Sequence, residues 1–138
     1  MSATAAAPEG HATVMVRRST IECGAAAEAA AAHYLQTQGL LVLAQNLRCR
    51  AGELDLVCRD GGVIVIVEVR HRATSDFGGA LASVTWRKQR KLIRATEFLR
   101  LSRPEWRARA LRFDVIAVRG RPDGTHEFDW IRDAFRVT

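Results

Sequence analysis

The apolar and polar positions along the chain predict two helices and five strands. Apolar residues recur at helical spacing from Ile21 to Gln38, and Gly39 follows as a common helix stop. A second helical pattern begins after Gly78 and Gly79 and continues to about Leu101. Strand patterns are expected at residues 40–50, in two hairpin arms within 52–70, at 111–118 and, as an edge strand, at 126–131. The order α-β-β-β-α-β-β predicts an α/β fold with a mixed sheet flanked by helices.

The predicted hairpin carries carboxylates in segments that otherwise resemble buried strands. Gly61 and Gly62 fit a two-residue turn, which favours residues that accept positive φ. Side chains alternate between the two faces of a strand. This turn therefore places Asp55 opposite Glu68 on one face. On the same face, Glu53 is expected opposite Arg70.

Two opposed carboxylates repel each other, and in a half-buried setting one must be protonated or a cation must lie between them. A divalent ion meets this need, because Mg²⁺ binds through one or two carboxylates and leaves room for a substrate phosphate. The alternative is an exposed charge ladder in which Arg70 pairs with Glu53 and Arg72 helps nearby. The hairpin residues alone leave both interpretations open.

Each predicted helix also places one charged residue in its apolar stripe. Glu28 lies in the first stripe, together with Ile21, Gly24, Ala32 and Leu35. Lys88 lies in the second stripe, together with Leu81, Val84, Leu92, Ala95 and Leu99. Either residue alone could extend from the edge of its stripe toward water. Together with the carboxylates of the sheet between them, they indicate an acidic metal-binding site with a cation beside it.

The charge balance is basic, with 21 Lys and Arg against 15 Asp and Glu and a net charge of +6. Such a balance suits a polyanionic partner, and arginine suits phosphate because its planar fork donates two hydrogen bonds at once. A solubilising surface would explain the charge equally well. Beside Trp86, the second helix carries a basic face, whose members are Arg87, Arg90, Lys91 and Arg94.

The length of 138 residues predicts a single domain, with residues 1–20 as a disordered tail and 21–138 as the folded part. The three cysteines show no CxxC spacing, so they predict neither a disulfide framework nor a zinc site and fit a reducing cytoplasm. Because no apolar run approaches the roughly 20 residues of a membrane span, we expect no membrane partner. Asp114 is expected to be structural, paired with a neighbouring arginine.

Five segments of the chain resemble the YraN-like family of small bacterial proteins: GAAAEAAAAHYLQTQG, NLRCRAGELDLV, VIVEVRHR, FGGALASVTWRKQRKL and RFDVIAV. The resemblance runs from about Gly24 to Phe135. It implies a restriction-endonuclease-like fold, related to Holliday-junction resolvases and PD-(D/E)xK nucleases. It therefore also implies a metal-dependent endonuclease that acts on phosphodiester bonds of DNA, with branched or junction DNA as the candidate substrate.

Carried over by position, the resemblance implies that Asp55, Glu68 and Glu28 bind Mg²⁺ or Mn²⁺, with Glu53 as an auxiliary acid. Arg70 stands where the family has a lysine. Arginine can stabilise charge on the phosphate, but its pKa above about 12 prevents it from acting as a base.

This departure leaves three possibilities open. Arg70 stabilises charge only, Lys88 supplies the missing amine, or the protein is catalytically weak. The basic face of the second helix and Arg72 are the expected nucleic-acid contacts. The alternative functions are a non-catalytic nucleic-acid-binding module with the nuclease fold and a structural protein whose acids pair with arginines. By analogy with junction enzymes, a homodimer is compatible with the proposed substrate.

Overall fold

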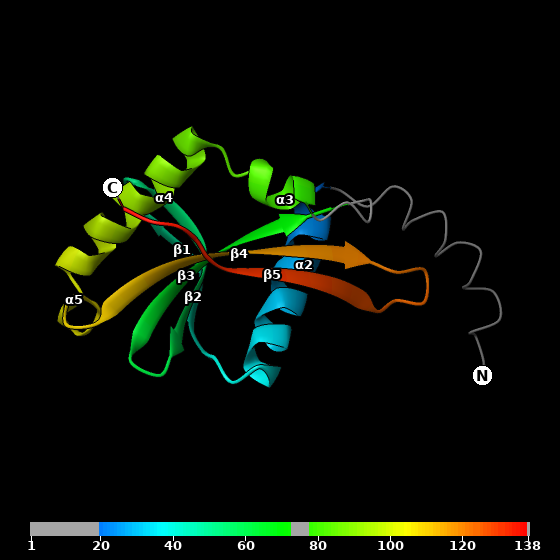
Figure 1. The fold of residues 1–138 in the computed structure, drawn as a ribbon, viewed down its shortest axis with the longest axis horizontal. Helices are drawn as coiled ribbons and strands as arrows, with labels where there is room; N and C mark the ends of the chain where they lie inside the picture. The colour runs from blue at the N-terminus through cyan, green and yellow to red at the C-terminus, as the bar shows by residue number, and fades with distance from the viewer. Residues whose placement is uncertain (1–19, 73–77, 138) are drawn as a thin grey trace.

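The computed structural model describes residues 20–72 and 78–137 (Figure 1). A five-stranded mixed sheet forms its centre, with the strands side by side in the order β1-β2-β3-β4-β5. The elements in chain order are α2 (Thr20–Thr37), β1 (Leu41–Cys49), β2 (Gly52–Asp60), β3 (Val63–His71), α3 (Gly78–Ala82), α4 (Trp86–Leu101), α5 (Pro104–Arg107), β4 (Ala110–Gly120) and β5 (His126–Phe135). The predicted order of elements and the mixed α/β class are confirmed.

Helices cover both faces of this sheet. On one face α2 packs through small residues, and Ala27, Ala31 and Leu35 are buried against it. On the other face α4 packs through Leu92, Ala95 and Leu99 and is joined by Trp106 of α5. The central strands are therefore buried on both faces, which is why their sequences read as nearly continuous apolar runs.

The central hairpin has the register that its glycines predict. The β2–β3 pairs run from Leu56↔Val67 to Asp60↔Val63, so Gly61 and Gly62 form the two-residue turn. Gly61 has a φ of 60°, which glycine accepts without steric cost. After β3 the chain crosses over through α3, α4 and α5 and returns as β4, which is parallel to β3.

The second helical segment differs from its predicted form. Its pattern predicts one continuous helix, whereas the structure has two helices, α3 and α4, separated at residues 83–85. Thr85 has an extended backbone, and its hydroxyl accepts a hydrogen bond from the Lys88 amide at 3.2 Å. This side-chain cap starts a new helix at Trp86. The break fixes the start of α4 and thereby the position of Lys88.

Two further boundaries also differ from the prediction. The edge strand β5 continues to Phe135, beyond the predicted end at residue 131, and Pro104 begins the short helix α5 inside the predicted connector. The predicted disordered tail lies outside the described residues, apart from Thr20, which begins α2. No helix in the described ranges is long and apolar enough to cross a lipid bilayer.

Candidate acidic site

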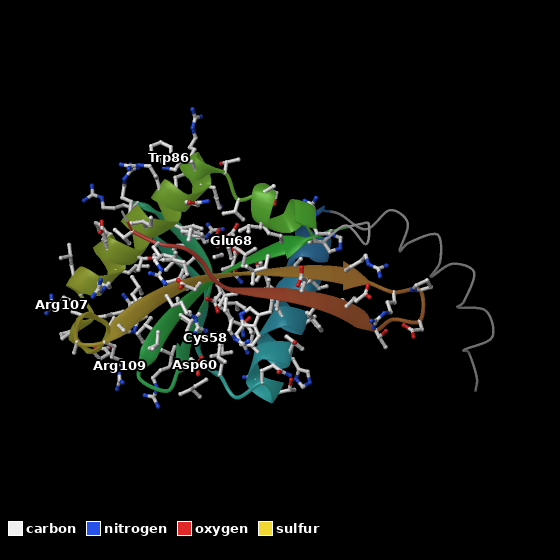
Figure 2. All side chains as sticks on the ribbon, viewed as in Figure 1. Cys58, Asp60, Glu68, Trp86, Arg107 and Arg109 are labelled. Carbon is white, nitrogen blue, oxygen red and sulfur yellow. The ribbon has the colours of Figure 1, made fainter. Side chains whose placement is uncertain are left out.

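Glu68 is the most deeply buried acid of the predicted site. It lies on β3 with only 4% of its surface exposed, and Figure 2 shows it near the middle of the molecule, between the α4 ribbon and the central strands. Its Oε2 atom lies 3.2 Å from Arg70 Nη1 and 3.6 Å from Lys88 Nζ. Its Oε1 atom is buried and has no hydrogen-bond partner among the described residues. One carboxylate oxygen thus faces two cations, and the other remains available to a further ligand.

Asp55 on β2 lies beside Glu68, as the hairpin register predicts. The β2–β3 ladder ends at Leu56↔Val67, and Asp55 is the next residue. Its Oδ2 atom accepts a hydrogen bond from the Val69 amide at 2.9 Å. The carboxylate takes up an amide that the ladder would otherwise use, so its position is fixed by the backbone of β3.

The proximity of the two acids changes the chemistry of Glu68. Its pKa is raised from the ordinary value near 4.5 to about 7. Burial is the largest cause and the charge of Asp55 the second, while Lys88 and Arg70 act in the opposite direction. A protonated Glu68 can form a hydrogen bond with the Asp55 carboxylate, whereas two ionised carboxylates only repel each other. The sequence predicted that a proton or a cation must offset the two opposed carboxylates. The raised pKa of Glu68 favours the proton, and Arg70 and Lys88 add positive charge at its Oε2 atom.

Glu28 reaches the same pair from the other side of the sheet. It lies on α2, half-buried at the edge of the alanine stripe. Burial raises its pKa first, and the charge of Asp55 raises it further. A side-chain hydrogen bond with Asn46 has the opposite effect on this pKa. Asp55 therefore stands between the glutamates of α2 and β3, and the predicted cluster of three acids is brought together.

An irregularity in β2 makes this arrangement possible. Strict alternation predicts that Glu53, Asp55 and Val57 share one face, but Leu54 and Val57 both pack into the α4-side core. The prediction is therefore wrong through this part of the strand. On the neighbouring strand, Asn46 has a φ of 51°, a conformation that asparagine tolerates better than most residues. Alternation is thus lost around Asp55, which lies near Glu68 of β3 and near Glu28 of α2.

The predicted pair between Glu53 and Arg70 is absent. Glu53 instead forms an exposed pair with Arg48 on β1, at 3.3 Å. Arg70 is held at Glu68, and its Nε atom donates a hydrogen bond to Ser83 Oγ at 3.1 Å. The alternative prediction of an exposed charge ladder between Arg70 and Glu53 is thus wrong. Glu53 lies at the exposed edge of the acidic site.

Two neighbours of the site, Ser83 and Asn46, were not predicted. Asn46 carried a usable signal, because asparagine within an apolar strand often marks a backbone irregularity. Ser83 carried none, since its role depends on the break between α3 and α4.

The site offers a metal ion two carboxylates rather than a complete set of protein ligands. Within residues 20–72 and 78–137, no group of three or more His, Cys, Asp or Glu side chains is placed so that it could hold a metal ion. Mg²⁺ does not require such a group, because it binds through one or two carboxylates and keeps several waters. The unpartnered Oε1 of Glu68 and the fixed carboxylate of Asp55 are a donor set of this kind.

The predicted basic face is present on α4 and is open to solvent. Its members Arg87, Arg90, Lys91 and Arg94 are exposed and form no ion pair with any described residue. Arg72, just after β3, is half-buried, and its amide donates to Val118 O. The role of these cations in nucleic-acid binding stays a prediction.

Asp114 is structural, as expected. It is fully buried on β4 and accepts two hydrogen bonds from the guanidinium of Arg112, at 2.9 and 3.0 Å. It also accepts from Trp130 Nε1 and from the Asp133 amide on β5, both at 2.9 Å. The bonds from Trp130 and Asp133 join β5 to β4.

The five-stranded mixed sheet, with helices on both faces and an acidic pair at the end of its central hairpin, has the architecture expected of a restriction-endonuclease-like α/β domain. Residues 27–118 match the model of the Uncharacterised protein family UPF0102. This chain belongs to that family, also called the YraN family.

Curated relatives support the assignment over most of the chain. A UPF0102 protein of Pseudomonas savastanoi pv. phaseolicola (strain 1448A / Race 6) is 46% identical over 121 residues, which cover 88% of this chain and 98% of the relative. A UPF0102 protein of Xanthomonas euvesicatoria pv. vesicatoria (strain 85-10) is 50% identical over 114 residues, which cover 83% and 91%. A UPF0102 protein of Pseudomonas putida (strain GB-1) is 44% identical over 121 residues, which cover 88% and 98%.

Proposed function

We propose that this protein is a metal-dependent DNA endonuclease that hydrolyses phosphodiester bonds, those of branched DNA included. One observation carries the proposal: the buried carboxylate of Glu68 lies beside Asp55, with two cations at its Oε2 atom and no hydrogen-bond donor from the described residues at its Oε1 atom. Metal-dependent phosphodiester hydrolysis uses a bound divalent ion and positive groups at the phosphate. This cluster offers ligands for the first and supplies the second.

The residues divide into two chemical roles. Asp55 and Glu68 would hold Mg²⁺ or Mn²⁺, with Glu28 binding directly or through water. The ion, when bound, supplies Lewis-acid chemistry at the phosphate. Arg70 and Lys88 would bind phosphate oxygens and stabilise the charge that develops on them. Because arginine stays protonated, Arg70 orients and neutralises but does not remove a proton.

A non-catalytic DNA-binding module is the second candidate, and the arginine at position 70 favours it. The two functions share the fold and the basic face of α4 and differ only in cleavage. Free thiols at Cys49 and Cys58 fit a reducing compartment, so we place either function in the cytoplasm. A two-fold homodimer is part of the proposal only by analogy with enzymes that act on junctions.

The deciding experiment incubates the purified protein with labelled branched, nicked and single-stranded DNA in Mg²⁺, Mn²⁺ or EDTA. Cleavage is expected with either metal and not with EDTA. Glu68→Gln should abolish it, because the substitution removes a charged ligand. Glu105→Gln, a change at an exposed acid of α5, should leave it intact. Binding of DNA without cleavage in any metal would contradict the nuclease and support the binding module.

A further inference from the structure

A cleft beside α4 lies apart from the acidic cluster. It has a volume of about 430 Å³, and its two walls are α4 and the end of the chain from Phe135 to Val137. Figure 1 shows these two segments next to each other at the C-terminal end of the molecule. Three arginines line the cleft, Arg90, Arg94 and Arg136, and one acid, Glu97. Arg136 is paired with Asp133 at 2.6 Å, whereas Arg90 and Arg94 form no ion pair with a described residue. The wall of the cleft that α4 forms is therefore basic, through Arg90 and Arg94.

Trp86 forms one end of this cleft and is unusually exposed. It is the first residue of α4, and 69% of its surface is open to solvent. The helix packs on the sheet through other residues, so the Trp86 ring contributes little to the core. The guanidinium of Arg90 lies 4.8 Å from the centre of the ring. A cation at this distance holds the ring in place and covers one of its faces.

We propose that this cleft binds an unpaired DNA strand and that Trp86 is the surface on which one of its bases stacks. The inference rests on the proposed function and names its substrate class, DNA with unpaired nucleotides. Sites for single strands combine a basic groove along the backbone with aromatic rings that stack on bases. In a duplex the base faces are covered by their neighbours, so a fully paired substrate cannot use the ring.

The position of Trp86 links the cleft to the acidic cluster. Lys88 lies on the same first turn of α4 and contacts Glu68 at 3.6 Å. Side chains two residues apart on a helix point to different sides, so the cleft and the acidic cluster are neighbouring sites on either side of the first turn of α4. Arg90 and Arg94, one and two turns along the helix, are placed to neutralise successive phosphates of a DNA strand in the cleft.

The test measures binding of oligothymidine and of a duplex of equal length, both in EDTA so that no cleavage is needed. Trp86→Ala should weaken oligothymidine binding by about tenfold or more, on the scale of losing one stacked base. Duplex affinity should stay close to that of the natural protein. Trp86→Phe keeps a ring and should bind nearly normally. Leu101→Ala is the matched control, because Leu101 lies at the other end of α4 with 70% of its surface exposed.

A second readout separates stacking from simple charge attraction. Oligothymidine should quench the tryptophan fluorescence of the natural protein, and most of this quenching should disappear in Trp86→Phe. Equal oligothymidine affinity in the natural protein, Trp86→Ala and Leu101→Ala would overturn the inference. Binding that depends on Trp86 without any cleavage would contradict the proposed nuclease and leave the inference standing. Cleavage at the natural rate by Trp86→Ala would contradict the inference and leave the proposed nuclease standing.

Discussion

At the residue scale, the burial of Glu68 changes the protonation of its carboxyl group. A buried carboxylate loses its hydration, and two cations and a neighbouring acid replace that hydration only in part. The result is a pKa near 7, so the protein has both forms of this group at neutral pH. Perturbed groups of this kind are enriched at functional sites.

The first prediction at this scale concerns pH and the metal-free protein. Between about pH 4.5 and 7 the folded protein keeps the Glu68 proton more tightly than the unfolded chain. Its free energy of unfolding, relative to Glu68→Gln, should therefore fall as pH rises through this window and then level off. Chemical denaturation of both proteins in EDTA measures the difference. A difference that does not change with pH would show that Glu68 titrates normally.

The second prediction concerns Arg70. If its role is to neutralise charge, Arg70→Lys should retain or increase cleavage, because lysine keeps the positive charge. Arg70→Ala should lower cleavage by roughly 10²-fold, the scale of losing one donor to the transition state. If Lys88 supplies the missing amine, Lys88→Ala should greatly lower cleavage by the natural protein. Adding Arg70→Lys to that variant should then partly restore cleavage. Natural rates in both alanine variants would contradict these roles, and cleavage by Arg70→Lys alone would favour the binding module.

At the scale of elements, the sheet depends on polar contacts as well as on its apolar core. The edge strand β5 pairs with β4 on one side only, and the ladder is irregular between Phe113 and Val115. Asp114 lies at this irregularity and bonds to the backbone and to a side chain of β5. The buried carboxylate of Asp114 thus holds β5 against β4 through hydrogen bonds.

The third prediction follows from this role. Asp114→Asn should lower the free energy of unfolding by about 3 kcal/mol, because it leaves Arg112 without its closest anion and Asp114's other donors poorly paired. Amide exchange in β5 should rise more than in the central hairpin. Asp133→Asn is the control, since its carboxylate pairs with Arg136 at the exposed surface and should matter little. Equal effects of the two changes would contradict the structural role of Asp114.

At the scale of the whole molecule, the acidic cluster joins parts of the chain that are distant in sequence. Glu28 comes from the helix on one face of the sheet, Lys88 from the helix on the other, and Asp55 and Glu68 from the hairpin between them. A ligand bound by this cluster would therefore link both layers of the fold. Its binding should stabilise the molecule as a unit.

The fourth prediction tests that linkage. Mn²⁺ or Mg²⁺ should raise the melting temperature, since a ligand that binds only the folded state adds about 2.7 kcal/mol at a hundredfold excess over its Kd. Asp55→Asn combined with Glu68→Gln should abolish the rise and leave the metal-free protein as stable as before or more so. A metal-free double variant that is badly destabilised would instead indicate that the acids form a structural ion-pair network.

The sequence by itself determined the order of the elements, the turn of the hairpin and the proximity of Asp55 to Glu68. These features follow from local periodicity and from glycine at Gly61 and Gly62, which act within a few residues of the chain. The sequence also marked Glu28 and Lys88 as charges on apolar stripes.

Only the tertiary structure decided which partners those charges take. Arg70 pairs with Glu68 and Ser83, and Glu53 pairs with Arg48, because side-chain alternation is lost in β2 between Leu54 and Val57 and a new helix begins at Trp86. Strand alternation assumes a regular ladder, and an irregularity moves side chains to other neighbours. The open ring of Trp86 beside Arg90 was likewise settled by packing, since the periodicity of α4 does not show how far the C-terminal segment covers it.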